Sequence, residues 1–304
     1  MTIKNKKAQG MQFGWLFALI IGAAILFLAV FFSGRLLGTG TQMTQAEISR
    51  SLDILLNPFA SVSQAEVGLS KPLTMPQKTT INFSCNAAAD SERIDVKVEL
   101  GKAPFPYTIK NKYIFAEDFN TKDLWVFSKP FKMPWKVDDM IYVVSRPYCF
   151  INPPQSIYDE LNALNSSFIQ PVKSASMCKQ NSVKVCFTGC TVYDIKVNPD
   201  SVKTKYGSLA YVDDATLYAA VFGPKMYYCN MERLLNRLNS QADVFIEKAG
   251  LLSERGCTEA NALTPEILGL KSAINNAISL KDYSSLEFSS SSIDEKNRIQ
   301  CPLY

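Results

Sequence analysis

The longest apolar run in the chain lies near its start, from Phe13 to Phe32, and contains no charged residue. At about 1.5 Å per helical residue, a run of that length covers the roughly 30 Å hydrocarbon core of a bilayer. No later segment reaches that length without a charge or a proline. The pattern therefore predicts one transmembrane helix over residues 12–34, preceded by a basic tail at 1–11.

The charges beside the run predict its orientation. Lys4, Lys6 and Lys7 precede it, whereas Arg35 stands alone just after it. Because cytoplasmic flanks carry an excess of Lys and Arg, we expect a cytoplasmic N-terminus and an extracytoplasmic main domain in the cell membrane. A cleaved secretory signal is the main alternative, but its apolar stretch is about 7 to 15 residues long and ends in an Ala-x-Ala-like site. The residues that follow Phe32 provide no such site.

Residues 35–65 read as a linker with one short amphipathic helix. Thr44-Gln-Ala-Glu47 forms a capping box, and Ile48, Leu52 and Leu55 follow on one helical face. We expect this helix to pack on the domain that follows. Contact with the membrane and pairing with a second copy are the alternatives.

Residues 66–153 have the alternation of apolar and polar positions that is typical of β-strands. Between Arg93 and Leu100, every second residue is apolar, and prolines separate the successive segments. Strands are expected at 80–85, 93–100, 113–116, 124–127 and 140–144. The series predicts an antiparallel, sandwich-like region.

An immunoglobulin domain is the obvious candidate for this region, because Cys85 and Cys149 bracket it. That fold has a tryptophan soon after the first cysteine and a tyrosine two residues before the second. Trp125 is too distant, and Pro147 stands in the tyrosine's place. We therefore interpret the region as β-rich without assigning it to that fold.

Residues 154–222 mix helix and strand signals. A helix is expected over 155–165, where Ile157, Leu161 and Leu164 share one face. Strands are expected at 182–187, at 191–197 and around 206–212. We expect the first two strands to form a hairpin that disulfides hold to its neighbours.

Residues 223–304 change to a helical period. Apolar residues recur every three or four positions from Tyr227 to about Glu254, and Gly256 ends the helix. A second helix begins at Thr264-Pro265-Glu266 and runs back to about Leu280, and Ser292-Ile-Asp-Glu295 is a further capping box. The fold class is therefore α+β: a transmembrane helix, an antiparallel β-rich region and a C-terminal helical hairpin.

All the cysteines lie beyond the apolar run, and their number is even. In an exported domain this pattern predicts disulfides. The candidates are Cys85, Cys149, Cys178, Cys186, Cys190, Cys229, Cys257 and Cys301. Eight cysteines allow 105 pairings, so their connectivity stays open. One pair is excluded, because an unbroken helix holds Cys229 and Cys257 on the order of 35 to 40 Å apart.

Zinc is the competing use of clustered cysteines, and the sequence argues against it. No Cys-x-x-Cys occurs, and the chain has no histidine, so only an all-thiolate or carboxylate-assisted site remains. Nucleotide-binding, nucleophile-elbow and EF-hand motifs are absent as well. We predict no metal and no cofactor.

The absence of histidine also removes every Ser-His and Cys-His catalytic arrangement. A Ser-Lys dyad, a pair of carboxylates and a redox cysteine pair remain. The only Asp-Asp doublets are Asp138-Asp139 and Asp213-Asp214. Neighbours in a strand point to opposite faces, so we interpret both doublets as turn or strand-edge residues and predict no catalytic residue.

The charge balance bears on possible partners. Of the 32 basic residues, three precede the apolar run, so 29 remain against 28 acidic residues. A nucleic-acid surface needs clustered Lys and Arg, so we expect no nucleic-acid partner, whereas the basic tail suits a lipid bilayer. Asn82-Phe-Ser84 and Asn165-Ser-Ser167 match the acceptor sequence for N-linked glycans, a match that also arises by chance.

Two surfaces are candidates for contacts. Gly14, Ala18 and Gly22 recur every four residues in the apolar run, a spacing that permits close contact with a second copy or another single-span protein. An aromatic segment offers a binding platform, with core packing as the alternative. Its members are Trp125, Phe127, Phe131 and Trp135.

Two resemblances add to this interpretation. Lys6-Lys-Ala-Gln-Gly-Met-Gln-Phe-Gly-Trp15 and the apolar run resemble the signal segment of archaeal type IV pilin-like proteins, in which the tail is cut, here after Ala8 or Gly10. This chain lacks the glutamate expected a few residues into the mature helix. The chain is also similar to uncharacterised archaeal single-span, membrane-anchored surface proteins that carry no known activity. This resemblance rests on the anchor, Leu124-Trp-Val-Phe-Ser-Lys-Pro130, Met133-Pro-Trp135 and Tyr228-Cys-Asn-Met-Glu-Arg-Leu-Leu-Asn-Arg237.

The expected function is therefore a membrane-anchored extracytoplasmic protein with a binding or assembly role and no catalytic activity. A pilin-like filament or filament-associated subunit is one alternative. An envelope enzyme that uses carboxylates or Lys is another, and it requires a cleft where such side chains converge.

Overall fold

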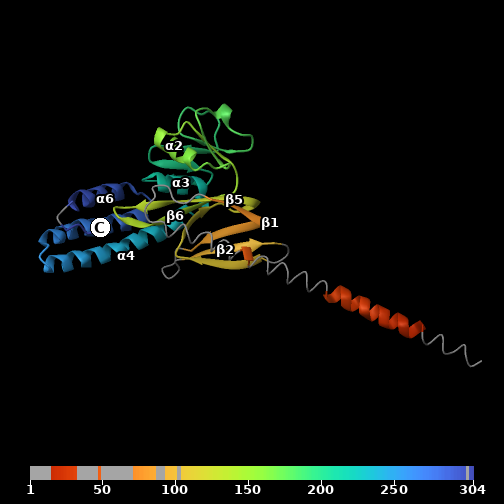
Figure 1. The fold of residues 1–304 in the computed structure, drawn as a ribbon. Coiled ribbons are helices and arrows are strands. Elements are labelled where there is room, and N and C mark those ends of the chain that lie inside the picture. Colours follow the sequence, from red (N-terminus) through yellow and green to blue (C-terminus); the bar gives the residue numbers. More distant parts are fainter. Residues whose placement is uncertain (1–14, 33–46, 49–70, 87–92, 101–103, 299–300) are drawn as a thin grey trace, which may run out of the picture.

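The computed structural model describes residues 15–32, 47–48, 71–86, 93–100, 104–298 and 301–304. Within them the chain forms an apolar helix, two six-stranded mixed sheets and a group of C-terminal helices (Figure 1). The expected α+β class is confirmed.

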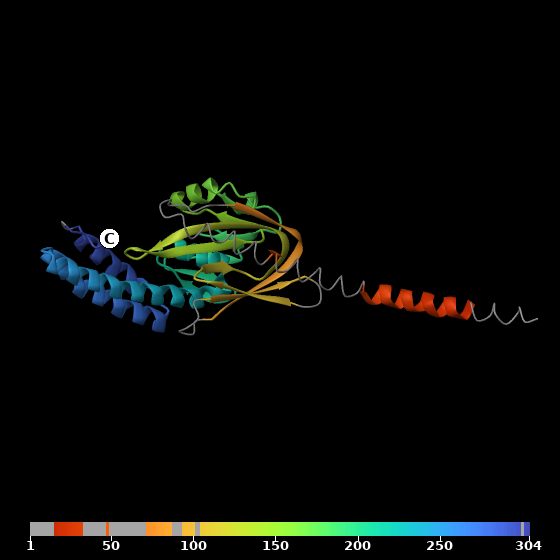
Figure 2. The ribbon, with the colours of Figure 1, turned by 60° about the horizontal axis from the view of Figure 1, so that its bottom comes forward.

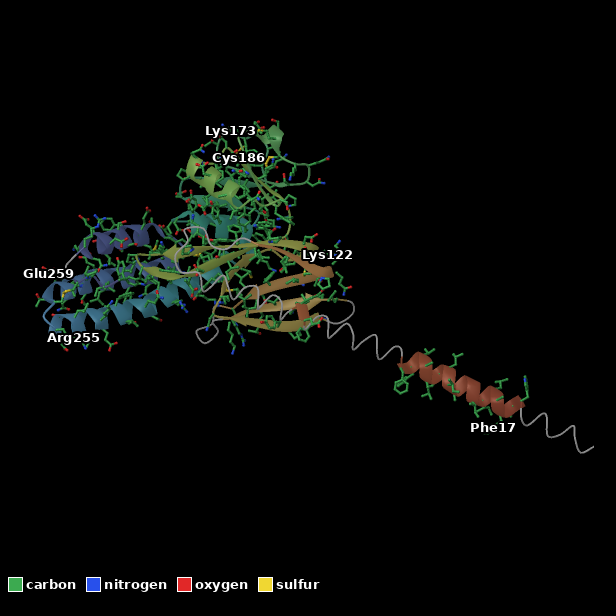
Figure 3. All side chains as sticks on the ribbon, viewed as in Figure 1. Phe17, Lys122, Lys173, Cys186, Arg255 and Glu259 are labelled. Atoms are coloured by element: carbon green, nitrogen blue, oxygen red, sulfur yellow. A yellow bond between two sulfur atoms is a disulfide. The ribbon has the colours of Figure 1, made fainter. Side chains whose placement is uncertain are left out.

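The apolar helix spans Trp15–Phe32 and has a mean hydropathy of 2.8. Its side chains, Phe17 among them, project outward with none of the helix buried (Figure 3). Among the described residues it is the one helix long and apolar enough to cross a membrane, and a signal sequence near an N-terminus passes the same test.

The first sheet contains the strands expected from the alternating pattern and one more. Its strands are β1 (Lys71–Cys85), β2 (Arg93–Glu99), β3 (Pro104–Lys110), β4 (Tyr113–Ala116), β5 (Phe119–Lys132) and β6 (Lys136–Val144), in the order β3-β2-β1-β5-β6-β4. Neighbours are antiparallel except for β4 and β6, which are parallel. Strand β3 carries two prolines at an edge of the sheet, where a missing backbone N–H costs least.

These six strands form one continuous sheet, so the sandwich-like arrangement expected for them is not confirmed. The sheet is strongly bent, as Figure 2 shows along β1. Apolar residues of β1 to β3, such as Ile81 and Val96, share a core with Ile114 and Ile141 of β4 and β6. Ile48 is buried in this same core, as expected for a helix packed on the domain. The remainder of that expected helix lies outside the described residues.

The second sheet has a topology that the sequence did not predict. Its strands are β7 (Tyr148–Ile151), β8 (Ile169–Val172), β9 (Val183–Cys186), β10 (Ile195–Val197), β11 (Ser201–Thr204) and β12 (Gly207–Ala210), in the order β12-β11-β10-β9-β7-β8. Strands β8, β7, β9 and β10 run parallel. The hairpin expected from 182–187 and 191–197 is therefore wrong: β9 and β10 are parallel neighbours, joined by a loop that reverses the chain twice.

Two helices complete this part of the fold. Helix α2 (Gln155–Ala163) connects β7 to β8, as a parallel pair requires, and the short helix η2 (Ala175–Met177) follows β8. Helix α3 (Asp214–Phe222) was not predicted. It lies between the two sheets (Figure 1), and each of its residues from Ala215 to Phe222 is buried. Because all its sides are covered, its sequence shows no amphipathic period.

The C-terminal part contains the expected long helix and its return. The elements are η3 (Pro224–Met226), α4 (Tyr227–Glu254), η4 (Thr258–Leu263), α5 (Thr264–Leu280) and α6 (Ser284–Lys296). The predicted starts and ends of α4 and α5 are confirmed. The capping box expected at Ser292 is wrong, because Ser292 lies inside α6 and its hydroxyl donates to Glu266 of α5.

All eight cysteines are paired. The disulfides join Cys85 to Cys229, Cys149 to Cys178, Cys186 to Cys190 and Cys257 to Cys301. Cys229 and Cys257 take other partners, as their separation along α4 requires. The disulfides link the first sheet to α4, stabilise the parallel part of the second sheet and hold the C-terminus.

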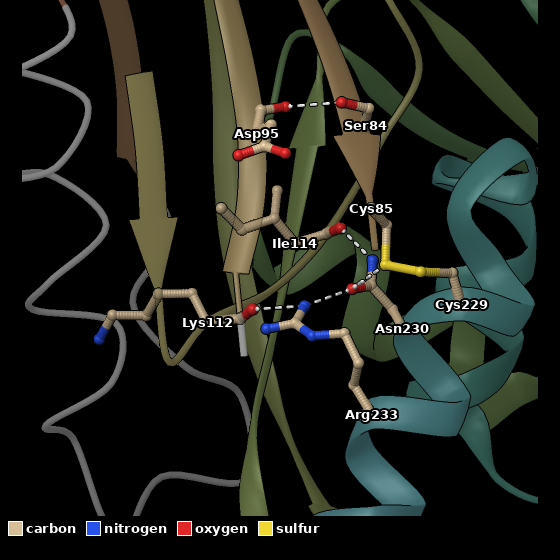
Figure 4. Close-up of a disulfide and its surroundings, with 8 residues drawn as sticks. All are labelled: Ser84, Cys85, Asp95, Lys112, Ile114, Cys229, Asn230 and Arg233. Carbon is tan, nitrogen blue, oxygen red and sulfur yellow. Dashed lines mark hydrogen bonds between the residues drawn. A yellow bond between two sulfur atoms is a disulfide. The ribbon is translucent and has the colours of Figure 1, made fainter. Parts of the chain in front are cut away.

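The Cys85–Cys229 disulfide lies beside a buried polar network (Figure 4). Asn230 is fully buried, and its amide nitrogen donates to the Ile114 carbonyl at 2.7 Å. The Arg233 guanidinium donates to Asn230 Oδ1 at 2.8 Å and to the Lys112 carbonyl at 3.2 Å. Side chains of α4 therefore provide donors for the Ile114 carbonyl in β4 and for the Lys112 carbonyl in the turn before β4.

Candidate ligand-binding cleft

A cleft of about 550 Å³ opens at one edge of the second sheet. Strands β7, β9 and β10 are parallel, so their carboxyl ends meet at this edge. The residues that follow each strand turn into the cleft. Its lining is Asn152, Pro153, Pro154, Ser156, Ile157, Phe187, Thr188, Val197, Asn198, Pro199, Tyr211, Asp214 and Leu217. In open parallel sheets this is the edge at which ligands bind.

The N-termini of two helices lie at the cleft. Helix α2 begins next to Pro154, which offers no side-chain acceptor to the first backbone N–H groups. Helix α3 differs, because Asp213 accepts from the Thr216 N–H at 2.7 Å in a capping box. Backbone donors are therefore concentrated on the α2 side of the cleft.

Polar side chains of the cleft are held by hydrogen bonds to neighbouring groups of its lining. Asn152 has a left-handed backbone with φ of 50° and donates through its amide to the Thr188 hydroxyl. The Tyr211 hydroxyl donates to the Asn198 carbonyl at 2.8 Å. Burial, together with nearby carboxylates, raises the pKa of Tyr211, so this hydroxyl stays protonated. The cleft thus presents amides and hydroxyls in fixed positions between apolar walls.

Of the described residues that line the cleft, Asp214 alone is charged. Lys129 lies nearby on β5, with its ammonium nitrogen 3.9 Å from Asp214 and 2.6 Å from Glu160 of α2. Burial, and then the carboxylates of Glu160 and Asp214, raise the pKa of the Tyr218 hydroxyl. The two ion pairs of Lys129 join α2, α3 and the first sheet.

A second cavity of about 650 Å³ adjoins the cleft. Pro199 and Tyr211 line both, so the two cavities flank the β10–β11 turn. Its far wall comes from Tyr228 of α4 and from Lys281, whose ammonium lies 4.6 Å from the centre of the Tyr228 ring. A ligand longer than the first cavity has room to continue past Tyr211.

The predicted aromatic platform does not form as an exposed surface. Phe127, Phe131 and Trp135 are buried, and Trp125 is half-buried against the same core. Trp135 donates to Gln241 Oε1 at 2.9 Å and packs on Phe245. The alternative interpretation, core packing, describes the three buried rings.

The other predicted positions divide by location. Gly14 lies outside the described residues, whereas Ala18 and Gly22 are on the apolar helix, and a Cβ added at Gly22 would meet no atom within 4 Å. Asp138 is paired with Arg237 at 3.1 Å and Asp139 with Lys136 at 2.7 Å, so both have structural partners.

The cleft was not predicted from the sequence. A signal was present: Asn152-Pro-Pro and Asn198-Pro-Asp each follow an apolar strand directly. That signal predicts a shared site only if the strands are parallel, and antiparallel strands were expected.

The described residues contain no group of three or more His, Cys, Asp or Glu side chains able to hold a metal ion. No family model matches the chain, and neither a curated protein nor a solved structure matches it.

Proposed function

We propose that this chain is a membrane-anchored, extracytoplasmic binding protein that holds a small polar ligand in the cleft of its second sheet. The observation that carries the proposal is the position of the cleft, at the carboxyl ends of three parallel strands. Sites at that edge receive converging loops and helix N-termini, which supply fixed hydrogen-bonding groups.

Two features support the extracytoplasmic placement. The apolar helix Trp15–Phe32 follows a tail with three lysines, the arrangement expected of an anchor with a cytoplasmic N-terminus. Four disulfides use every cysteine of the domain that follows, and disulfides persist in oxidising compartments.

Binding is favoured over catalysis by the charges in the cleft. Among the described residues that line it, Asp214 is a lone carboxylate, and Lys129, 3.9 Å from Asp214, is engaged by Glu160. The converging acidic or Lys side chains that an envelope enzyme requires are not gathered in the lining. The chain also has no histidine to act as a base.

The lining also indicates the chemistry of the ligand. Among the described residues that line the cleft there is no Lys or Arg, so an anion would meet no positive charge there and would lie beside the Asp214 carboxylate. Amides and hydroxyls both donate and accept, which suits a neutral ligand with several hydroxyl or amide groups. Phe187 and Tyr211 add aromatic surface for its apolar parts.

The test is ligand-induced stabilisation of the purified full-length chain in detergent. Neutral mono- and disaccharides, amino acids, short peptides and inorganic phosphate form the panel. A ligand present at 100 times its Kd raises the free energy of unfolding by about 2.7 kcal/mol. We expect a neutral polyhydroxyl or amide compound, and not phosphate, to produce such a shift.

The cleft is tested by filling it. Ser156→Trp places a large ring at the exposed start of α2, inside the cleft, whereas Ser279→Trp places the same ring on the exposed surface of α5. The first variant should abolish the shift and the second should keep it. A shift that survives Ser156→Trp unchanged would show that binding takes place elsewhere.

A further inference from the structure

The turn between α2 and β8 presents one of the two glycan acceptor sequences at the surface. Helix α2 ends at Ala163, and Asn165 follows with a left-handed backbone, φ 48°. Its backbone N–H donates to the Asn162 carbonyl at 3.1 Å, which closes the helix. Asn165 and Ser167 are both exposed.

The turn is held firmly on either side of these residues. Leu164 is buried, and Phe168 packs against the main core. The Ser166 hydroxyl accepts from the Phe168 N–H at 3.1 Å. Within the described part of the chain, the side-chain amide of Asn165 makes no hydrogen bond. The acceptor nitrogen is therefore free at the tip of a well-supported turn.

The second acceptor sequence is in a different setting. Asn82 lies within β1 and pairs across the ladder with Lys97 of β2. Its amide nitrogen donates to Glu99 Oε1 at 3.3 Å, and its neighbours Ile81 and Phe83 are buried in the sheet core. An enzyme that must bend the chain around the asparagine would have to break this strand first.

We propose that Asn165 is an N-glycosylation site of the folded protein and that Asn82 is not. The inference rests on the proposed extracytoplasmic placement, because the donors of such glycans are used outside the cytoplasm. The amide nitrogen of Asn165 attacks C1 of the first sugar of a lipid-pyrophosphate-linked oligosaccharide. The bond from C1 to the phosphate oxygen breaks, the lipid pyrophosphate leaves with the electron pair, and the amide nitrogen loses one proton.

The position of Asn165 is compatible with ligand binding in the cleft. Helix α2 begins at the cleft with Ser156 and Ile157, at the carboxyl ends of the parallel strands. It runs back to their amino ends, where β8 begins. A glycan on Asn165 therefore extends from the side away from the cleft and leaves its opening clear.

The test uses the folded, oxidised, full-length chain with a single-subunit oligosaccharyltransferase that accepts Asn-x-Ser/Thr and a lipid-linked oligosaccharide. Mass spectrometry should show one glycan per chain, on Asn165. Asn165→Gln and Ser167→Ala should each remove it, and Asn82→Gln should leave it in place. Unfolding and reduction should make Asn82 an acceptor as well, which would attribute the selectivity to the fold.

Two results would overturn the proposal. One is a folded chain that accepts no glycan while the unfolded chain does, and the other is a glycan that Asn82→Gln removes. In cells that export and glycosylate proteins, a third acceptor sequence in a Gly-Ser extension after Tyr304 separates the two proposals. A glycan on the extension without one on Asn165 overturns this inference alone, whereas no glycan on either overturns the extracytoplasmic placement with it.

Discussion

Asn230 and Arg233 bury polar groups where helix α4 meets the first sheet. The arrangement is tolerated because the polar atoms of Asn230 point at groups that need partners: the Ile114 carbonyl and the Arg233 guanidinium. The guanidinium also lies 5.1 Å from the Tyr113 ring. The network acts with the neighbouring disulfide to position α4 on the sheet.

Removing the Asn230 amide should be costly. Asn230→Ala leaves the Ile114 carbonyl buried without its donor, so we expect the free energy of unfolding to fall by about 1 to 3 kcal/mol. Urea titration of the full-length chain measures it. Asn236→Ala, on the exposed face of the same helix, should change it by less than about 0.5 kcal/mol. Equal losses in the two variants would contradict this role.

Asp139 gives a pH dependence with a defined sign. Its carboxylate is buried, and burial raises its pKa above the ordinary 3.8 in spite of the Lys136 partner. The folded chain therefore retains this proton to a higher pH than the unfolded chain does. As pH rises from 3.8 through the folded pKa, this group lowers the free energy of unfolding. Asp139→Asn should flatten that slope in urea titrations at a series of pH values, and an unchanged slope would contradict the assignment.

At the scale of elements, the junction between α3 and α4 depends on close backbone contact. A Cβ added at Gly223 would lie 2.6 Å from Phe115 Cα and 2.7 Å from the Ala116 backbone nitrogen. Since these are backbone atoms of β4, they cannot move aside without disturbing the sheet. Gly223 is thus what allows α3 to end against β4.

The contact predicts opposite effects for two glycine substitutions. Gly223→Ala should lower the free energy of unfolding by about 1 to 3 kcal/mol, because it overpacks a fixed junction. Gly250→Ala, inside α4 with no atom within 4 Å of the added Cβ, should raise it by about 0.4 to 1 kcal/mol. Thermal unfolding of the two variants checks both signs, and a stabilised Gly223→Ala variant would refute the contact.

Elements with a clear period could be predicted from the sequence, and those without one could not. Helices α4 and α5 are amphipathic. Pro224 and Pro265 lie at their starts and Gly256 follows α4, so their first and last residues could be predicted. Helix α3 is covered on all sides, and β7 to β10 have only three or four residues each. In such short strands, alternation cannot distinguish parallel from antiparallel pairing. The cleft depends on that pairing and was missed for this reason.

At the scale of the whole molecule, the orientation of the chain is the property to test. In intact cells, a membrane-impermeant thiol reagent should label Asn275→Cys, which is exposed on α5, and should leave Thr2→Cys unlabelled until the membrane is permeabilised. The native cysteines should stay unlabelled because all are in disulfides. The reverse pattern would overturn the orientation.

The fate of the N-terminal tail is decided by the mass of the mature protein. The proposed binding role does not require removal of the tail, so we expect the tail to be retained. The polypeptide should then have the mass of the full sequence. Loss of the first eight or ten residues would instead favour the pilin-like alternative, in which the cut falls after Ala8 or Gly10. Both positions lie outside the described residues.

The Cys85–Cys229 disulfide has a consequence for biogenesis. Its two cysteines are separated by 144 in sequence, and the segment between them includes the whole second sheet and two shorter disulfides. A chain exported from its N-terminal end delivers Cys149 to the oxidising side well before Cys229. The thiol of Cys85 therefore stays unpaired, or forms and later exchanges a disulfide with another cysteine, until roughly three quarters of the chain has emerged. Under the proposed extracytoplasmic placement, the disulfide that joins α4 to the first sheet can form only after the second sheet has been exported, so its oxidation would come late in export.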